Sequence, residues 1–327
     1  MLYIRNDSHD PHHNLALEEY AFKNLELEES IILLWQNAPS VIIGRYQNTV
    51  EEINSEYIKK NNIYVVRRIT GGGAVYHDLG NLNFSFIVKE TQSDIDFRKF
   101  TDPVIKALSE IGIEASHTGR NDIAIDGKKF SGNAQCHQRG KTLHHGTILF
   151  NSCLENVQAA LNVKADKIES KGIKSVRSRV TNILDYLDKK VTLREFRDTL
   201  LNYLFECQPI REYILTAADK ANIRRLMEEK YLTWEWNYGN SPAYNIIKTG
   251  RYPSGGIEVR LNVEKGIITE CKIYGDFFSS AEVDELAARF VGVKYREEDL
   301  AALLADVDLI EYLGAITREE FLQCLLY

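Results

Sequence analysis

Short runs of β-branched and apolar residues alternate with helical segments from the start of the chain to about Tyr244. Short apolar runs are typical of strands, and apolar residues spaced by three or four are typical of helices. No repeat or low-complexity linker interrupts this stretch, so it predicts one domain. Because the helices and strands do not follow a strict βαβ rhythm, the pattern favours an α/β (α+β) fold with a mixed sheet over a doubly wound one.

The expected elements of this domain follow from their apolar patterns. We predict strands at residues 31–35, 40–43, 63–68, 83–88, 122–125, 129–132 and 146–150. We predict helices at residues 14–25, 97–111 and 193–205. The first of these helices is close to amphipathic, with one apolar face.

The character of the sequence changes after Tyr244. Residues 256–263 and 267–274 alternate in period two around a short glycine-containing turn, and helical segments then run to the end. A chain of 327 residues is long enough for about two domains. We therefore expect a large domain at residues 1–245 and a small α+β domain at residues 246–327.

Composition and charge argue against several classes of protein. No apolar run approaches the roughly 18 to 20 residues that a membrane span needs, so no membrane partner is expected. The first residues lack a basic segment followed by an apolar one, which indicates a cytoplasmic protein rather than a secreted one. Five widely spaced cysteines, an odd number, argue against a disulfide framework and against metal-binding cysteine pairs. The net charge of -7 disfavours nonspecific binding to nucleic acid, and no such partner is expected.

The first motif with chemical content is VVRRITGGGAVYHDLGNLNFSF, residues 65–86. Without Cβ atoms, Gly71, Gly72 and Gly73 can adopt positive φ and let a ligand approach the peptide N–H groups closely. Arg68 can add a bidentate fork suited to phosphate. The motif therefore predicts an anion-binding cradle, although neither GxxxxGK[ST] nor GxGxxG is present. The alternative is a flexible surface turn flanked by solvated arginines.

The second motif, GRNDIAIDGKKFSGNAQ, contains an Asp-Gly turn signal between two short strands. Successive strand residues point to opposite faces, so one of Lys128 and Lys129 should face solvent and the other the site. The pattern does not decide which lysine faces the site, and two exposed turn lysines are the alternative. Asn121 and Asp122 offer oxygen ligands for a magnesium-bound nucleotide.

Two further motifs carry histidines and basic residues. In LHHGTILFN, no carboxylate or cysteine at a supporting spacing accompanies His144 and His145, so we expect core or substrate-contacting histidines rather than metal ligands. In KGIKSVRSRVTNIL, Lys174, Arg177 and Arg179 could bind phosphate or nucleic acid. Aromatic platforms for bases are missing nearby, which favours a solvated basic face.

In this order the four motifs resemble those of the lipoate-protein ligases in the biotin and lipoate ligase superfamily. The likeness covers nearly the whole chain, because WEWNYG at residues 234–239 and the segment 251–277 resemble the end of the family's catalytic domain and its accessory domain. The resemblance implies a mixed-sheet biotin/lipoate-ligase-like catalytic domain that binds lipoate and ATP at residues 1–245. It implies a small accessory domain at residues 246–327.

The resemblance also implies an ATP-dependent reaction in two steps. The enzyme would activate lipoate as lipoyl-AMP, release pyrophosphate, and transfer the lipoyl group to the ε-amine of a lysine on a partner protein. The implied partners are lipoyl domains of 2-oxoacid dehydrogenase E2 subunits and the glycine cleavage H protein. ATP and Mg²⁺ are implied as cofactors, and the family's small domain is thought to move between the two steps.

The family's central lysine precedes its [VF]SG segment, a position held here by Lys129. An ammonium that touches both the lipoate carboxylate and the α-phosphate offsets their repulsion and the charge that develops during attack. The resemblance implies ATP contacts by Arg68, Gly73, Ala74, Val75, Tyr76 and Lys129. It implies lipoate contacts by Lys129, Gly72 and His145, and magnesium binding by Asp122. For the lipoyl tail we expect an apolar slot with walls at Val75, Phe84 and the strand around Ile148.

Two other functions compete with this interpretation. One is an octanoyl- or lipoyltransferase that uses no ATP and passes the acyl group through a thioester on Cys153. The other is a non-catalytic lipoate- or biotin-binding regulator, for which the sequence offers no recognisable DNA-binding module. The context of Lys129 and the extra domain after residue 244 favour the ligase, which makes Cys136 and Cys153 structural thiols.

Overall fold

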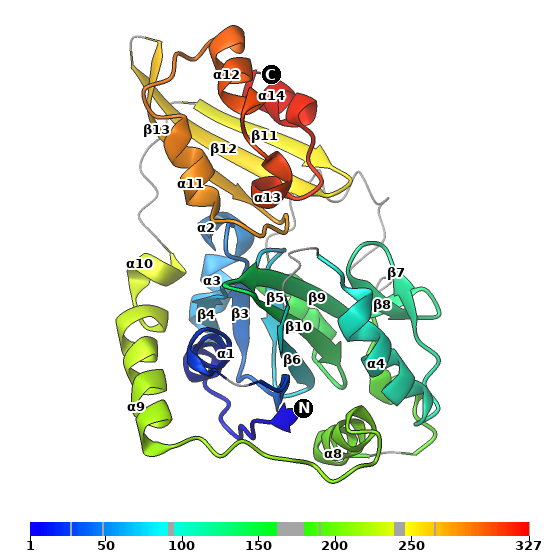
Figure 1. Ribbon diagram of the computed structural model, residues 1–327. Helices are drawn as coiled ribbons and strands as arrows, with labels where there is room; N and C mark the ends of the chain where they lie inside the picture. Colours follow the sequence, from blue (N-terminus) through cyan, green and yellow to red (C-terminus); the bar gives the residue numbers. More distant parts are fainter. Residues whose placement is uncertain are drawn as a thin grey trace.

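The computed structural model describes residues 1–26, 28–47, 49–90, 95–161, 180–189, 191–238, 246–264 and 266–326. These residues form a large domain and a small C-terminal domain, which lie at the bottom and the top of Figure 1. The predicted boundary at residue 245 falls outside the described residues and stays a prediction. The basic residues Lys174, Arg177 and Arg179 also fall outside them.

A mixed sheet forms the core of the large domain, which confirms the predicted fold class. Within the described residues, seven strands follow the order β1-β2-β6-β10-β9-β8-β7. Their bounds in that order are Leu2–Tyr3, Ile31–Trp35, Asn81–Lys89, Lys141–Leu149, Lys128–Gln138, Asp122–Ile125 and Ser116–Thr118. β1 and β2 are parallel, and the other neighbours are antiparallel. Every residue of β2 is buried, as expected for a strand covered on both faces.

A smaller sheet in the same domain carries the first motif. As far as the chain is described, its strand order is β4-β3-β5, with bounds Tyr64–Arg67, Ser40–Ile43 and Val75–His77. β3 pairs parallel with β4 and antiparallel with β5, so this sheet is mixed as well. The connection from β4 to β5 contains the three adjacent glycines, which places them at the end of a short sheet rather than on a free surface turn.

Helix α1 (Pro11–Asn24) packs between the sheets and the outer helices α9 (Ala217–Leu226) and η2 (Met227–Tyr231). The helix starts at Pro11 because the side chain of Asp10 caps it by accepting a 2.9 Å hydrogen bond from the backbone N–H of His12. The prediction of one apolar face was wrong. α1 is buried on most sides because α9 and η2 cover the side turned away from the sheets.

The other helices of the large domain cover the two faces of its sheets. Their bounds are α2 Thr49–Glu52, α3 Ser55–Lys60, α4 Arg98–Ser109, α5 Leu154–Ala160, η1 Ile183–Tyr186, α8 Leu193–Leu204 and α10 Trp234–Asn237. α4 and α8 pack against each other, and their apolar faces close the core over β6 and β9. Their positions agree with the helices predicted at 97–111 and 193–205 within a few residues.

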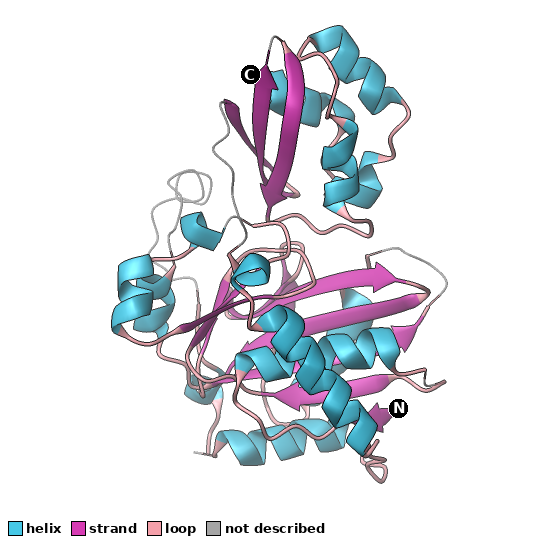
Figure 2. Ribbon diagram, turned by 90° about the vertical axis from the view of Figure 1, so that its left-hand side faces the viewer, coloured by secondary structure: helices cyan, strands magenta, loops and turns pink. Residues whose placement is uncertain are grey.

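The small domain combines a sheet with helices, as predicted. β11 (Ile246–Tyr252), β12 (Gly255–Glu264) and β13 (Ile267–Gly275) form an antiparallel sheet. The helices α11 to α14 gather on one side of it in Figure 2 and have the bounds Val283–Arg289, Glu297–Ala305, Leu309–Leu313 and Arg318–Leu326. The sheet and helices share an apolar core of their own, so this domain has the buried cluster that independent packing needs.

The two domains contact each other through the loop after β3. The ring of Tyr46 stacks on Phe277 with centroids 5.3 Å apart, and its hydroxyl donates to the carbonyl of Ala281 at 3.1 Å. Next to it, Arg45 forms an ion pair with Glu282. Tyr46 therefore anchors the start of the small domain's helical part to the large domain.

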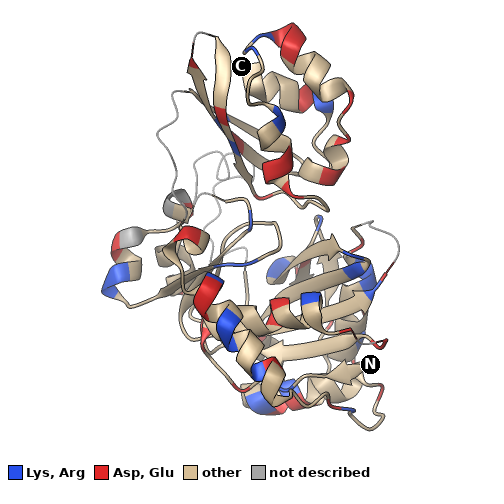
Figure 3. Cartoon of the chain, turned by 60° about the vertical axis from the view of Figure 1, so that its left-hand side comes forward, with Lys and Arg blue, Asp and Glu red and all other residues tan. Residues whose placement is uncertain are grey.

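Charged residues of both signs are interspersed over both domains in the view of Figure 3. No helix among the described residues is both long enough and apolar enough to cross a membrane.

Candidate functional site

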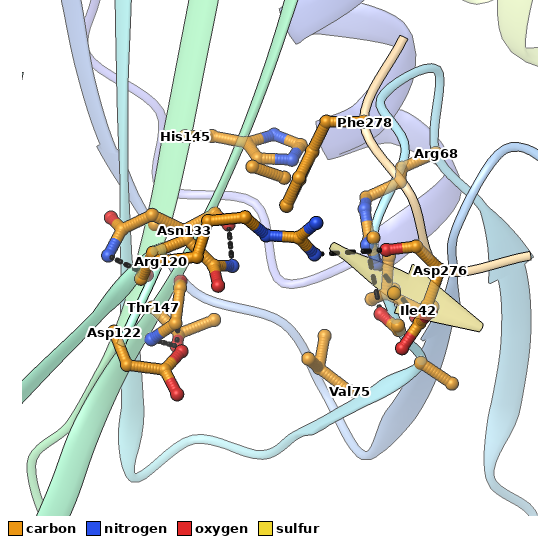
Figure 4. Close-up of a pocket in the computed structure, with 18 of the residues that line it drawn as sticks. Ile42, Arg68, Val75, Arg120, Asp122, Asn133, His145, Thr147, Asp276 and Phe278 are labelled. Atoms are coloured by element: carbon orange, nitrogen blue, oxygen red, sulfur yellow. Dashed lines mark hydrogen bonds between the residues drawn. The ribbon is translucent and has the colours of Figure 1, made fainter. Parts of the chain in front are cut away.

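A cavity of about 630 Å³ lies where the glycine loop, strands β9 and β10, and the start of the small domain meet. Figure 4 shows part of its lining, with residues from both domains. Its volume is in the range of sites for drug-sized ligands. The cavity contains most of the residues that the sequence singled out, namely Arg68, Gly72, Gly73, Ala74, Val75, Asp122, Lys129 and His145.

The glycine loop is held in place by the buried side chain of Arg68. Its Nη2 donates to the carbonyls of Gly71 at 2.7 Å and Gly73 at 2.9 Å, and its Nε donates to Thr70 Oγ1 at 3.0 Å. Burial lowers the pKa of Arg68 to about 10, so the guanidinium remains charged at neutral pH. Arg68 therefore braces the loop from within. The predicted phosphate contact of this side chain stays a prediction.

The glycines of the loop are needed for two different reasons. Gly72 has φ of +90°, and a Cβ there would lie 3.1 Å from the ring of Phe278. A Cβ on Gly71 would lie 2.3 Å from the carbonyl oxygen of Phe277, whereas one on Gly73 would meet nothing closer than 3.9 Å. The small domain thus packs directly on the loop, and the N–H of Gly72 donates to the carbonyl of Phe277 at 3.2 Å. The sequence predicted bare backbone for a ligand, but part of this backbone faces the other domain.

The hairpin β8–β9 directs Lys129 towards the cavity. Its turn residues Asp126 and Gly127 have φ of +50° and +74°, as a two-residue hairpin turn requires. Lys128 is exposed, whereas Lys129 lines the cavity with its Nζ 2.8 Å from Asp122 Oδ1. The structure thereby decides which lysine faces the site, a point that the sequence pattern left open.

A β-bulge in this hairpin shapes the site. The register shifts between Ile123 and Ala124, so that Lys129 pairs with Ala124 and Ser131 pairs with Ile123. Phe130, between them, is fully buried in the core of the large domain. A Cβ on Gly132 would lie 2.8 Å from Lys129 Nζ, so the glycine leaves room for the ammonium.

His145 belongs to a chain of buried polar groups below the glycine loop. Its Nδ1 lies 2.9 Å from Glu18 Oε1, and its Nε2 lies 2.8 Å from Thr70 Oγ1. Glu18 also accepts a 2.6 Å hydrogen bond from Ser85 Oγ. Contacts at both ring nitrogens fix the orientation of the imidazole. The sequence reasoning missed Glu18, whose signal is the pair of adjacent carboxylates, Glu18 and Glu19, within the otherwise apolar run LALEEYAF.

The neighbouring His144 has a different environment. Its ring stacks on Phe100 with centroids 4.9 Å apart, and burial holds its pKa well below 6.5. His144 is therefore a neutral core histidine, and His145 is the one that reaches the cavity. No group of three or more metal-binding side chains occurs in the described part of the chain.

The apolar walls of the cavity differ in part from the predicted slot. They include Leu15, Trp35, Ile42 and the predicted Val75. The predicted strand around Ile148 also contributes, through Gly146 and Thr147, although Ile148 itself is buried in the core. The prediction of Phe84 was wrong, because it is fully buried in the core and does not line the cavity. The pairing of β6 with β10 explains the error for Phe84. Phe84 lies opposite Gly146, and its ring fills the space next to that glycine.

Tyr76 is the one proposed ATP contact whose side chain does not line the cavity. It points into a separate apolar cluster with Val41 and Ile43, and its hydroxyl accepts a 3.3 Å hydrogen bond from Asn156 Nδ2. Since alternate residues of a strand face opposite sides, Val75 faces the cavity and Tyr76 does not. Any contact of Tyr76 with a nucleotide would therefore be made by its backbone.

Cys153, the thiol on which the transferase alternative depends, is exposed and lies outside the cavity. Its Sγ donates to Glu155 Oε2 at 3.4 Å. None of the described cysteines lines this cavity, so it offers no thiol for a thioester mechanism.

Comparisons with known proteins agree with the sequence motifs. The family described as lipoyl protein ligase A/B catalytic domain matches residues 10–205, and the one described as bacterial lipoate protein ligase C-terminus matches residues 241–325. Over 327 residues the chain is 50% identical to the lipoate-protein ligase LplJ of Bacillus subtilis, which covers 98% of this chain and 99% of the relative.

Two solved structures extend the comparison to the fold. P. falciparum LipL1, in complex with lipoate, has a TM-score of 0.80 and 25% identity and covers 99% of this chain and 98% of its own. A lipoate-protein ligase A bound with ATP has a TM-score of 0.65 and 31% identity and covers 73% of this chain and 98% of its own.

Proposed function

The chain belongs to the lipoate-protein ligase family, and we propose that it activates lipoate with ATP and transfers the lipoyl group to a lysine of a partner protein. The first step would form lipoyl-AMP and release pyrophosphate. The second would form an amide bond and release AMP. Relatives of the same fold solved with lipoate and with ATP support both substrates.

The observation that carries this proposal is the position of Lys129. Its ammonium lies 2.8 Å from Asp122 Oδ1 in a cavity whose lining also includes the apolar side chains of Leu15, Trp35, Ile42 and Val75. A carboxylate and a triphosphate repel each other, and a cation between them offsets that repulsion as the attacking oxygen approaches the α-phosphorus. Lys129 is the proposed catalytic residue for this reason.

The lining suggests how lipoate lies in the cavity. We place its carboxylate near Lys129 and its apolar tail along Val75, Ile42 and Trp35. Each buried methylene would contribute about 0.8 kcal/mol to binding. His145 and the backbone of Gly72 lie at the glycine-loop side of this path and are the other proposed lipoate contacts.

ATP is proposed to bind along the glycine loop. Gly73, Ala74 and Val75 line the cavity there, and Arg68 holds the loop in shape. Mg²⁺ usually keeps several waters and takes one or two carboxylates together with phosphate oxygens, and the single carboxylate of Asp122 fits such a site. Bound there, Mg²⁺ would neutralise part of the triphosphate charge.

The second step needs no nucleophile from the enzyme, because a lysine amine can attack the mixed anhydride directly. The site must instead exclude water, and the small domain over the glycine loop supports that role. We propose lipoyl domains of 2-oxoacid dehydrogenase E2 subunits and the glycine cleavage H protein as acceptors. Because the reaction consumes ATP, we propose the cytoplasm as its location.

Lipoate-dependent exchange of labelled pyrophosphate into ATP tests the first step, and intact mass of a purified lipoyl domain tests the second. Lys129→Ala should lower exchange by roughly 10² or more, if its ammonium stabilises the transition state. Lys128→Ala, the exposed neighbour on the same hairpin, is the matched control and should exchange like the wild type. Acyl transfer without ATP that is abolished by Cys153→Ser would contradict the proposal and favour a thioester transferase.

A further inference from the structure

A second group of charges lines the cavity and is contributed by both domains. Arg120 precedes β8 in the large domain, whereas Arg251 lies near the end of β11 and Asp276 directly follows β13 in the small domain. All three line the same cavity as Lys129. Figure 4 shows the guanidinium of Arg120 reaching across the cavity to Asp276.

The contacts within this group fix its geometry. Arg251 Nη1 lies 3.1 Å from Asp276 Oδ2, and the backbone carbonyl of Asp276 accepts from Arg120 Nη2 at 3.4 Å. The guanidinium of Arg120 also lies over the ring of Phe278, 4.6 Å from its centroid. The two arginines are therefore held near each other although they come from different domains.

Two glycines of the small domain make this arrangement possible. Gly255 has φ of +145°, and a Cβ there would lie 2.8 Å from Asp276 Oδ1. A Cβ on Gly256 would lie 2.9 Å from Arg251 Nη1, and the N–H of Gly256 donates to Asp276 Oδ1. The two glycines at the start of β12 thus let the side chains of Arg251 and Asp276 meet across this strand, which holds Arg251 at the cavity.

The charges of the lining favour a multiply charged anion at this end. The cavity is lined by the four cations Arg68, Arg120, Lys129 and Arg251, against the two carboxylates Asp122 and Asp276. Arg68 hydrogen-bonds to the carbonyls of the glycine loop, and Lys129 is proposed to bind the lipoate carboxylate and the α-phosphate. That leaves Arg120 and Arg251, and guanidinium groups bind phosphate in a bidentate fork. A guanidinium has five N–H donors, so the contact of Arg251 with Asp276 is compatible with a second contact to phosphate.

We propose that Arg120 and Arg251 bind the β- and γ-phosphates of ATP, so that the small domain supplies a cation to the adenylation step. This inference rests on the proposed function. In that step a lipoate carboxylate oxygen forms a bond to the α-phosphorus, and the bond from the α-phosphorus to the oxygen that bridges it to the β-phosphorus breaks. The electron pair leaves with pyrophosphate, whose growing negative charge Arg120 and Arg251 stabilise.

The proposal separates the two half-reactions. Adenylation and its reverse, the attack of pyrophosphate on lipoyl-AMP, both involve the β- and γ-phosphates. Transfer from lipoyl-AMP to an acceptor lysine involves neither of them. Loss of Arg251 should therefore slow the first step and leave the second unchanged.

The test uses the full chain and two assays, pyrophosphate exchange into ATP and lipoyl transfer from synthetic lipoyl-AMP to a lipoyl domain. Arg251→Gln should lower exchange by roughly 10- to 100-fold, with transfer within about 2-fold of the wild type. Arg251→Lys should recover part of the exchange because it restores the charge without the fork. Arg289→Gln, at an exposed position on α11 of the same domain, is the matched control and should leave both assays unchanged.

Asp276→Asn distinguishes phosphate binding from a structural ion pair. It weakens the contact with Arg251 but keeps the arginine, so exchange should fall much less than in Arg251→Gln. Equal loss of exchange in the two variants, equal loss of exchange and transfer in Arg251→Gln, or normal exchange in Arg251→Gln would each overturn the proposal. A wild type without any lipoate-dependent exchange would instead overturn the proposed function itself.

Discussion

Replacing Gly72 by alanine should disturb the glycine loop far more than the same change at Gly73. Gly72 has φ of +90°, where an L-residue is strained, and its added Cβ would lie 2.9 Å from Arg68 Nη2 and 3.1 Å from the ring of Phe278. Gly73 is a fair control, because it lies next to Gly72 in the same loop and its Cβ would approach only Asp276 Cβ, at 3.9 Å.

The magnitude follows from two contributions. Placing alanine in left-handed backbone costs about 1 to 2 kcal/mol. Moving the guanidinium of Arg68 weakens a charge-assisted hydrogen bond to the carbonyl of Gly71 or Gly73, which contributes about 1.5 to 3 kcal/mol. Together they predict a loss of roughly 2.5 to 5 kcal/mol for Gly72→Ala. For Gly73→Ala the reduced freedom of the unfolded chain predicts a change of less than about 1 kcal/mol.

Thermal unfolding of the two variants is the measurement. At about 2 to 4 °C per kcal/mol, Gly72→Ala should lower the Tm of the large domain by roughly 5 to 20 °C, and Gly73→Ala should leave it within a few degrees of the wild type. Similar Tm values for both variants would refute the reasoning, because it assigns the cost to the φ angle and the neighbours of Gly72 alone.

Three further changes test other parts of the structure. Gly132→Ala should lower pyrophosphate exchange about 10-fold or more, because its Cβ would displace Lys129 Nζ, with the Tm nearly unchanged. Glu18→Gln should lower both exchange and the Tm, because its amide NH₂ would replace the oxygen 3.0 Å from His145 Nδ1, at a cost of about 1 to 3 kcal/mol. Unchanged values in both would contradict the buried network. Burial holds the pKa of His77 at about 3 and that of His144 well below 6.5. Both histidines are neutral when folded and take up protons when unfolded, so stability present above pH 6.5 should fall by about 1.4 kcal/mol per pH unit for each as the pH drops towards 5. Denaturant midpoints between pH 5 and 7 check this, and a flat profile would contradict it.

Much of the fold could be predicted from local patterns. The buried strand 31–35 and the hairpin of the small domain have strong apolar signals, and the structure places strands at both. The strands predicted at 129–132 and 146–150 are parts of the longer β9 (Lys128–Gln138) and β10 (Lys141–Leu149). Polar residues such as Asn133 and His145, which line the cavity, interrupt the apolar pattern within these strands, so the predicted segments were shorter than the strands.

The candidate site was predictable where a motif is local, and less so where residues far apart meet. Lys129 and Gly72 lie in recognisable motifs. Glu18 instead reaches the site by contacting His145, which lies 127 residues later in the chain. Arg251 reaches the cavity through the packing of two domains, which no sequence pattern in either domain specifies. The error at Phe84 has the same origin, because strand pairing decides which face of the strand packs on the core and therefore which side chains are buried there.

Helix α1 is held against rotation by two neighbouring residues that bond in different directions. Glu18 bonds to Ser85 and His145 towards the sheet, and Glu19 bonds to Lys230 and Tyr231 in the helix that covers the other side. Turning or sliding the helix would break both sets at once. Leu15, one turn earlier on the same helix, lines the cavity, so the two sets of bonds also fix the position of this part of the cavity wall.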